Sequence, residues 1–204
     1  MSGPDQAELQ PGRERIWDLP LRLFHWALAA CVITGWYLGY FRTFATIGWH
    51  FWLGYTVCGL LAFRILWGLF GPRPARFSSL VWPPRATLTY AATMIGRTPS
   101  HFPGHSPLGS LSVIAMLIAL VVQVLTGLCA EDDALFSTGP LAGYLSPSTI
   151  VTLTAIHHIN ARIILALVGL HLFAIVWYLV WKRENLITAM ITGWKTVSRH
   201  SGEA

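Results

Sequence analysis

Five of the eight histidines fall inside long apolar segments, where a polar ring is unfavourable unless it has a partner or a function. They are His25, His50, His157, His158 and His171. An ionisable side chain in hydrocarbon is costly, so such a residue is by default a functional feature. One of them could simply hydrogen-bond to a neighbouring helix. Five together favour a shared role, and imidazole is a common metal ligand.

The spacing of two of these histidines suits a helix that presents rings at two depths. His157 and His171 are 14 residues apart, which is within about 40° of four full helical turns and spans about 21 Å. The two side chains therefore share one helix face. His158 lies about 140° away from His171 by the same arithmetic, so His157 is the better partner and His158 points elsewhere.

The composition indicates that these histidines are positioned by membrane-spanning helices. The chain is 54% hydrophobic and only 11% charged, against about 25% charged residues in soluble domains. A membrane helix needs roughly 20 mainly apolar residues. Four segments qualify, at about residues 21–41, 48–70, 108–130 and 155–181. We therefore predict an all-α, integral membrane four-helix bundle that forms a single domain over residues 1–204. The first 15 residues are polar, so we expect no cleavable signal peptide.

The charges predict an orientation. Most of the 14 Lys and Arg residues lie before the first span, within residues 71–107, or after the last span. A basic balance could indicate nucleic-acid binding, but this distribution follows the positive-inside rule. Both termini and the 71–107 loop are then cytoplasmic, and the acidic loop 131–154 lies outside. Residues 85–97 could form a short amphipathic helix on the membrane surface.

This topology sorts four of the histidines into two levels. His25 and His171 fall near the inner side, and His50 and His157 near the outer side. Two facing imidazoles at one level can ligate a haem iron from above and below. The predicted axial pairs are therefore His25 with His171 and His50 with His157, with His158 as the alternative to His157. Such an iron has no open position and exchanges single electrons.

Two arginines are candidates for binding the haem carboxylates. Arg64 lies 14 residues after His50, on the same face at the inner depth, and Arg22 lies one turn before His25. Guanidinium–carboxylate contacts are strong, although both side chains could instead reach the cytoplasmic interface. His158 and Arg162, one turn apart on another face of the last span, could meet a haem carboxylate, a quinone oxygen or a partner subunit.

Other chemistry is not indicated. The three cysteines stand alone without a CxxC motif, which argues against zinc ribbons, iron–sulfur clusters and covalent c-type haem. The sequence shows no nucleophile motif, phosphate-binding loop or dinucleotide fingerprint. We therefore predict no catalytic residues, and enzyme activity beyond electron transfer stays open.

Several stretches resemble the bacterial cytochrome b561 and nickel–iron-hydrogenase b-type cytochrome family. They are residues 16–26 (Ile-Trp-Asp-Leu-Pro-Leu-Arg-Leu-Phe-His-Trp), Arg76-Phe77, residues 104–109 (Gly-His-Ser-Pro-Leu-Gly) and residues 169–171 (Gly-Leu-His). Stand-alone members tend to have glutamate after the first ligand of the fourth helix, where this chain has His158. The stretch at residues 104–108 is closer to the members that bear partners.

The resemblance implies two non-covalent haems b and electron exchange with the quinone pool in the bacterial inner membrane. We therefore expect a dihaem cytochrome linking quinone to a periplasmic hydrogenase, dehydrogenase or c-type cytochrome. A self-contained quinone reductase for a small reductant is the alternative within redox chemistry. A haem-free membrane anchor or transporter is the alternative of another class.

Overall fold

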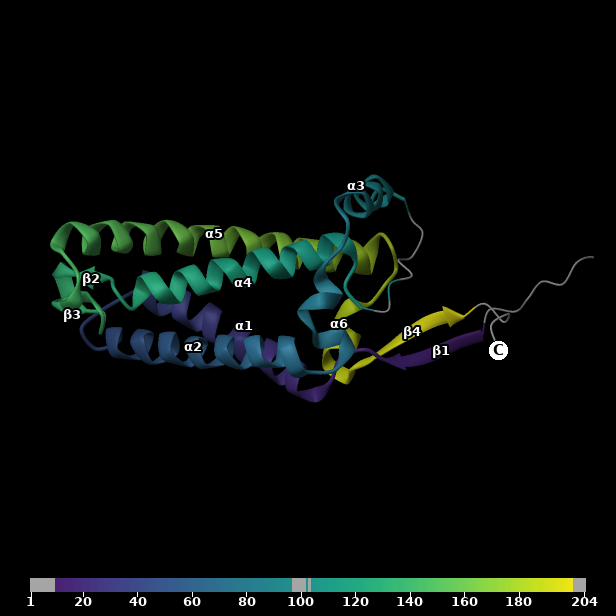
Figure 1. Ribbon diagram of the computed structural model, residues 1–204, viewed down its shortest axis with the longest axis horizontal. Helices are drawn as coiled ribbons and strands as arrows, with labels where there is room; N and C mark the ends of the chain where they lie inside the picture. Colours follow the sequence, from purple (N-terminus) through teal and green to yellow (C-terminus); the bar gives the residue numbers. More distant parts are fainter. Residues whose placement is uncertain (1–9, 97–101, 103, 200–204) are drawn as a thin grey trace, which may run out of the picture.

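The computed structural model describes residues 10–96, 102 and 104–199, and four long apolar helices dominate it (Figure 1). They are α1 (Leu19–Tyr40), α2 (Ile47–Phe70), α4 (Pro107–Gly127) and α5 (Pro147–Val180). Each is long and apolar enough to cross a membrane. Helices α1 and α2 form one antiparallel hairpin, α4 and α5 form another, and α2 packs on α4. The predicted membrane helical bundle is confirmed.

Three of the four helices start with the same local device. Asp18, Ser106 and Ser146 each place a side-chain oxygen on a backbone N–H three residues later, and a proline follows in the first turn. An N-cap oxygen accepts a hydrogen bond from an N–H group that the helix itself leaves unpaired. Proline has no backbone N–H, so it adds no unpaired donor to the first turn. These caps set where the helices begin.

Helix α5 starts at Pro147 rather than near residue 155. The stretch before residue 155 carries several hydroxyl side chains, and one of them, Thr152, donates its hydroxyl to the Ser148 carbonyl of the same helix at 2.9 Å. With 34 residues, α5 is about 50 Å long. It is therefore longer than the hydrocarbon core of roughly 30 Å and projects beyond it.

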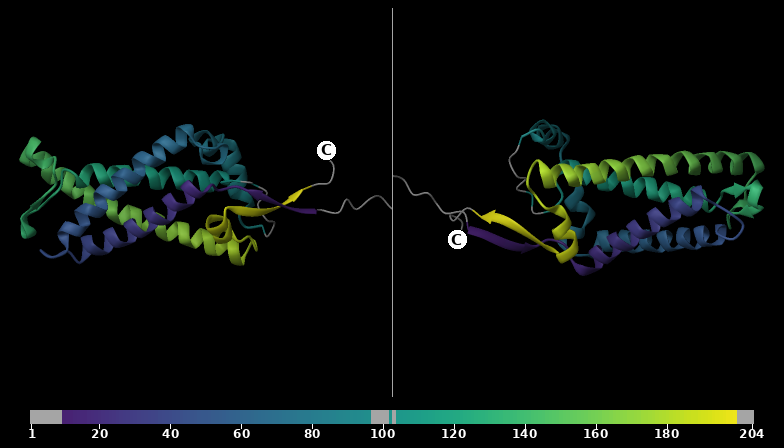
Figure 2. Two further views of the ribbon diagram at one scale, coloured as in Figure 1. Left: turned by 90° about the horizontal axis from the view of Figure 1, so that it is seen from below. Right: turned by 180° about the vertical axis from the view of Figure 1, so that it is seen from behind.

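Shorter elements gather at one end of the bundle, here called the inner end (Figures 1 and 2). They are η1 (Arg73–Ala75), η2 (Phe77–Leu80), α3 (Pro84–Thr93), α6 (Leu186–Thr192) and the strands β1 (Gln10–Arg15) and β4 (Trp194–Arg199). Strands β1 and β4 pair antiparallel, Gln10 opposite Arg199 and Arg15 opposite Trp194. Both described ends of the chain therefore lie at the inner end. Helix α3 falls in the expected surface-helix segment, whose last residue, Arg97, lies outside the described residues.

The opposite, outer end carries a small ribbon. Strands β2 (Glu131–Asp132) and β3 (Ser137–Thr138) pair around η3 (Asp133–Leu135), and η4 (Ala142–Tyr144) follows. Arg42, in the α1–α2 link, forms an ion pair with Asp132. This contact ties the two helical hairpins together at the outer end.

The buried core has two parts. One lies at the inner end and includes Ile16, Trp17, Leu21, Phe24, Ala75 and Ala189. The other, formed by Val57, Leu61 and Leu120, joins α2 to α4. Many apolar side chains remain exposed along the helices, as expected where lipid rather than water surrounds them.

Candidate metal centres

The structure brings four of the in-span histidines together in two facing pairs. The ring centroids of His25 on α1 and His171 on α5 are 6.4 Å apart, with an interplanar angle of 53°. Those of His50 on α2 and His157 on α5 are 6.2 Å apart at 86°. These are the combinations expected from the sequence, and iron ligation by them stays a prediction.

Both separations fit a metal ion held between two imidazoles. A bond from a metal to an imidazole nitrogen is about 2 Å, so two bonds plus the nitrogen-to-centre distance of each ring give roughly 6 Å. Among the described residues, no group of three or more His, Cys, Asp or Glu side chains could hold an ion. Two-ligand centres of this kind suit haem, because its macrocycle supplies the remaining ligands.

Glycines and backbone carbonyls position the two rings of the outer pair, His50 and His157. The Nδ1 atom of His50 lies 2.9 Å from the Gly35 carbonyl oxygen. A Cβ atom at Gly39 would come within 2.9 Å of the His50 ring, and one at Gly127 within 2.8 Å of the His157 ring. Only glycine leaves room for the rings at these two positions.

A chain of hydrogen bonds connects Asn160 through Gln123 to His157. The buried Asn160 places Nδ2 at 2.8 Å from both the Ala119 carbonyl oxygen and Gln123 Oε1. Because a backbone carbonyl only accepts, the amide group of Asn160 that faces it must be NH₂. The oxygen of Gln123 therefore faces Asn160, and the Gln123 NH₂ group faces His157 Nε2 at 3.1 Å.

These contacts fix the tautomer of His157. With a donor facing Nε2, the ring proton sits on Nδ1, which donates to the Gln123 carbonyl oxygen at 3.0 Å. This leaves a lone pair on Nε2, the nitrogen that a metal would take, with Nδ1–H bonded behind it. A metal there would displace the Gln123 amide. Sequence reasoning missed both amides as site residues, although Gln123 is the only strongly polar side chain of its span.

The inner pair has different surroundings. The Nδ1 atom of His25 is buried and has no hydrogen-bond partner among the described residues. Nearby, His105 packs its ring 4.6 Å from that of Trp17. Burial lowers the pKa of His105 to about 4, and the positive charge of Arg64 and the rings of His171 and His25 add to the effect. His105 is therefore neutral at pH 7 and close to the inner pair, a position that the sequence alone did not reveal.

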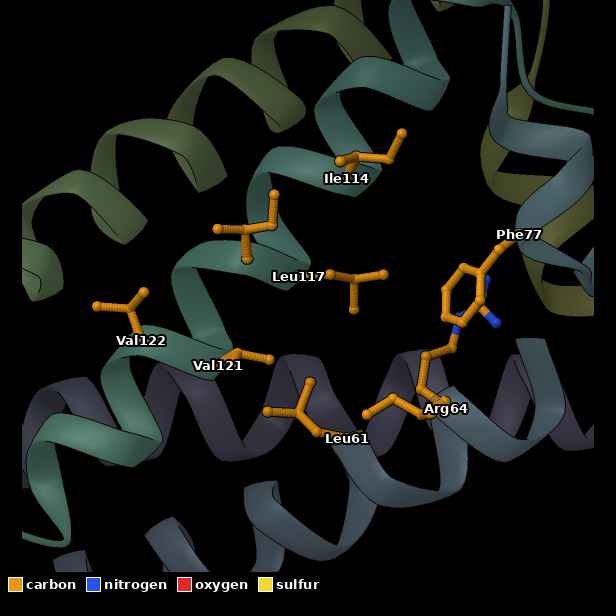
Figure 3. Close-up of a pocket in the computed structure, with 9 residues that line it drawn as sticks. Leu61, Arg64, Phe77, Ile114, Leu117, Val121 and Val122 are labelled. Atoms are coloured by element: carbon orange, nitrogen blue, oxygen red, sulfur yellow. The ribbon is translucent and has the colours of Figure 1, made fainter. Parts of the chain in front are cut away.

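Arg64 is buried at the inner level, 4% exposed. Its guanidinium carbon lies 4.6 Å from the centre of the Phe77 ring, and its Nη1 atom has no partner in the described part of the chain. Figure 3 shows Arg64 and Phe77 together at the edge of an apolar pocket between α2 and α4. The pocket measures about 300 Å³. Arg64 thus has a free donor for an anionic or carbonyl oxygen.

The remaining predicted polar residues are Arg22, His158 and Arg162. Arg22 donates to the carbonyl oxygens of Thr192, at 3.1 Å, and Ile191, so it holds the last turn of α6. A cation is favourable at a helix C-terminus, a structural role that the sequence did not suggest. His158 and Arg162 are exposed, and the His158 ring lies 6.0 Å from that of His157.

Comparison with known proteins gives the family. The family of prokaryotic cytochrome b561 matches residues 16–193. The chain belongs to this family. It is therefore an integral membrane b-type cytochrome that uses haem b in electron transport.

Three curated relatives share the name "Probable Ni/Fe-hydrogenase B-type cytochrome subunit". The relative from Azotobacter vinelandii is 23% identical, over 88% of this chain and 87% of its own. That from Rhodobacter capsulatus is 24% identical, over 89% and 80%, and that from Rhizobium leguminosarum bv. viciae is 24% identical, over 87% of each chain. No solved structure matches this member of the family.

Proposed function

We propose that this cytochrome holds two haems b, one between His25 and His171 and one between His50 and His157. It passes electrons across the membrane between a periplasmic redox partner and the quinone pool. The observation that carries the proposal is the presence of two facing ring pairs, at 6.4 and 6.2 Å, on opposite halves of one bundle. A single pair would serve only one side of the membrane.

Bound haem would supply the exchange of single electrons, because a histidine pair would leave its iron no open position. The residues of the chain do the rest. Helix α5 supplies one ring to each pair, the Gly35 and Gln123 carbonyls orient the outer rings, and apolar helix faces exclude water. The free donor of Arg64 suits a haem carboxylate at the inner level, whereas the donors of Arg22 that bond to α6 are already used.

The orientation follows from the charges. Arg73, Arg76, Arg85 and Lys182 lie at the inner end, and Glu131, Asp132 and Asp133 at the outer end. The positive-inside rule then makes the inner end cytoplasmic, in the bacterial inner membrane. The names of the relatives support a hydrogenase as the partner; a dehydrogenase or a c-type cytochrome would use the same outer face.

The test is the haem content of the full chain, purified in mild detergent. A pyridine haemochrome assay should give two haems b per chain, and a redox titration should resolve two one-electron steps. One haem per chain would contradict the proposal, and a folded preparation without haem would favour an anchor or transporter. Reduction of quinone by a small soluble reductant, with no partner present, would favour a self-contained quinone reductase.

A further inference from the structure

Helix α3 is attached to the four-helix bundle by one face. Its buried Tyr90 side chain hydrogen-bonds to the hydroxyl of Tyr178 on α5. Just before α3, the Trp82 ring donates from Nε1 to the buried Ser110 Oγ on α4 at 3.1 Å. Ser110 lies in the first turn of α4, and Tyr178 lies in the last turn of α5. These contacts hold α3 at the level where the two long helices reach the inner end of the bundle.

The opposite face of α3 exposes large aliphatic side chains. Leu88 lies two positions before Tyr90, which turns it about 200° away around the helix, and it is 72% exposed. Val81 and Ile95, on either side of α3, are 75% and 79% exposed. All three lie outside the four long helices, where exposure to water is unfavourable. Their gathering on one short segment indicates an apolar neighbour outside the chain.

The direction of α3 suits contact with a membrane surface. Figures 1 and 2 show this helix beside the bundle at the inner end, running across the long axis of the four long helices. A helix in this direction is parallel to the plane of the membrane that those helices cross. Interfacial helices bury an apolar face between the headgroups and the first part of the acyl chains. Helix α3 therefore has the depth and the direction of an interfacial helix.

The charge of this segment indicates which lipids it would meet. Residues 71–96 contain Arg73, Arg76 and Arg85, all exposed, and no Asp or Glu. Within the described part of the chain, none of these three arginines forms an ion pair. Basic segments next to spanning helices attract the anionic lipids of the cytoplasmic leaflet. A second copy of the chain would instead set these cations against one another.

We propose that residues 81–95 form a surface that binds anionic phospholipids of the inner leaflet. The aliphatic side chains insert among the acyl chains, and Arg85 binds phosphate groups of the lipid. Because Tyr90 is hydrogen-bonded to Tyr178, seven residues after His171, the lipid-bound helix also steadies the inner end of α5. The inference is independent of the proposed function, since neither haem nor electron transfer enters it.

The test compares the full chain in two lipid environments. The protein is placed in nanodiscs of phosphatidylcholine alone or of phosphatidylcholine with phosphatidylglycerol, and hydrogen exchange of the α3 amides is followed by mass spectrometry. These amides should exchange roughly fivefold or more slowly in the anionic discs, because one arginine near an anionic surface contributes about 1 kcal/mol. Arg85→Gln should reduce the difference between the discs about fivefold. Leu88→Gln should speed the exchange in both kinds of disc.

A matched variant separates this surface from a general effect of charge. Arg183→Gln removes an exposed cation from the same end of the molecule but outside the segment, and it should exchange as the wild type does. The lower local pH at an anionic surface acts on all variants alike. Equal exchange in the two discs would overturn the proposal, and so would an equal effect of Arg183→Gln and Arg85→Gln. Protection by inorganic phosphate in the phosphatidylcholine discs would also overturn it, because the site would then take a free anion.

Discussion

The two ring pairs are built differently although their spacings are nearly equal. At the outer pair, the Nδ1 atom of each histidine lies at hydrogen-bond distance from a backbone carbonyl oxygen of a neighbouring helix, 2.9 Å for His50 and 3.0 Å for His157. At the inner pair, the corresponding atom of His25 has no partner among the described residues. The loop residue His105 lies near both rings of the inner pair and near the buried Arg64 instead.

The comparison suggests that geometry controls the outer centre and charge controls the inner one. Backbone carbonyls fix ring direction and raise ligand basicity, and they cannot be moved without moving a helix. A buried guanidinium instead acts on the charge of a bound group and stabilises its more negative form. The following predictions, from the largest expected effect to the smallest, test this difference.

Replacing His171 with Ala should remove the inner haem and leave part of the outer one. The two rings of α5 are about 21 Å apart along the helix, so the loss should be local. A pyridine haemochrome assay should fall from two haems per chain to about one. Loss of both haems from a folded variant would show that the centres are not independent.

At the outer centre, His157→Ala should abolish one haem while His158→Ala retains both. The His157 ring faces His50, whereas His158 is exposed. Reduced-minus-oxidised spectra of the two variants provide the comparison. The opposite result would make His158 the outer ligand.

Gly127→Ala should lower the occupancy of the outer haem and spare the inner one. The new Cβ would come within 2.8 Å of the His157 ring, and the hydrogen bond to the Gln123 carbonyl resists a shift of that ring. Gly59→Ala is the matched control, because a Cβ there meets no atom within 4 Å. Equal haem content in both variants would contradict close packing of the His157 ring against Gly127.

Arg64→Gln should lower the midpoint potential of the inner haem without changing the outer one, because the loss of a buried positive charge destabilises the more negative ferrous form. A loss worth about 1 kcal/mol corresponds to roughly 40 mV for one electron. Gln123→Leu is the matched outer change and should leave the outer potential unchanged, because bound haem would displace this amide from His157 Nε2 and the backbone carbonyl that accepts from Nδ1 remains. Potentiometric titration checks both, and a shift of the same haem in both variants would refute the comparison.

The smallest effect is expected at the outer surface. Slight burial alone would raise the pKa of Asp132. The hydrogen bond and charge of Arg42, together with two backbone N–H groups, lower the pKa by more than burial raises it, so the pKa lies below its ordinary value. The ion pair therefore stabilises the fold above pH of about 4 and is lost as pH falls through the lowered pKa. Asp132→Asn should cost less than about 1 kcal/mol at pH 7 and nothing in strong acid. Thermal unfolding at the two pH values measures this difference.

The sequence predicted what depends on periodicity and missed what depends on register between elements. Apolar length found the four spans, and helical arithmetic placed His157 and His171 on one face. The contact of Gln123 with Asn160 requires knowing how α4 lies against α5, which no pattern within either helix reveals. The bonds from Arg22 to α6 and the position of His105 depend likewise on how loops fold back. The early start of α5 was missed because its hydroxyl groups bond to the helix itself.

Helix α5 supplies a ring to each pair and is the last of the four long helices to be synthesised. Until it enters the membrane, the growing chain presents His25 and His50 as solitary side chains that cannot grip a metal from two sides. A polypeptide that stalls before Pro147 therefore lacks both centres. Cofactor capture is in this way coupled to the synthesis of α5.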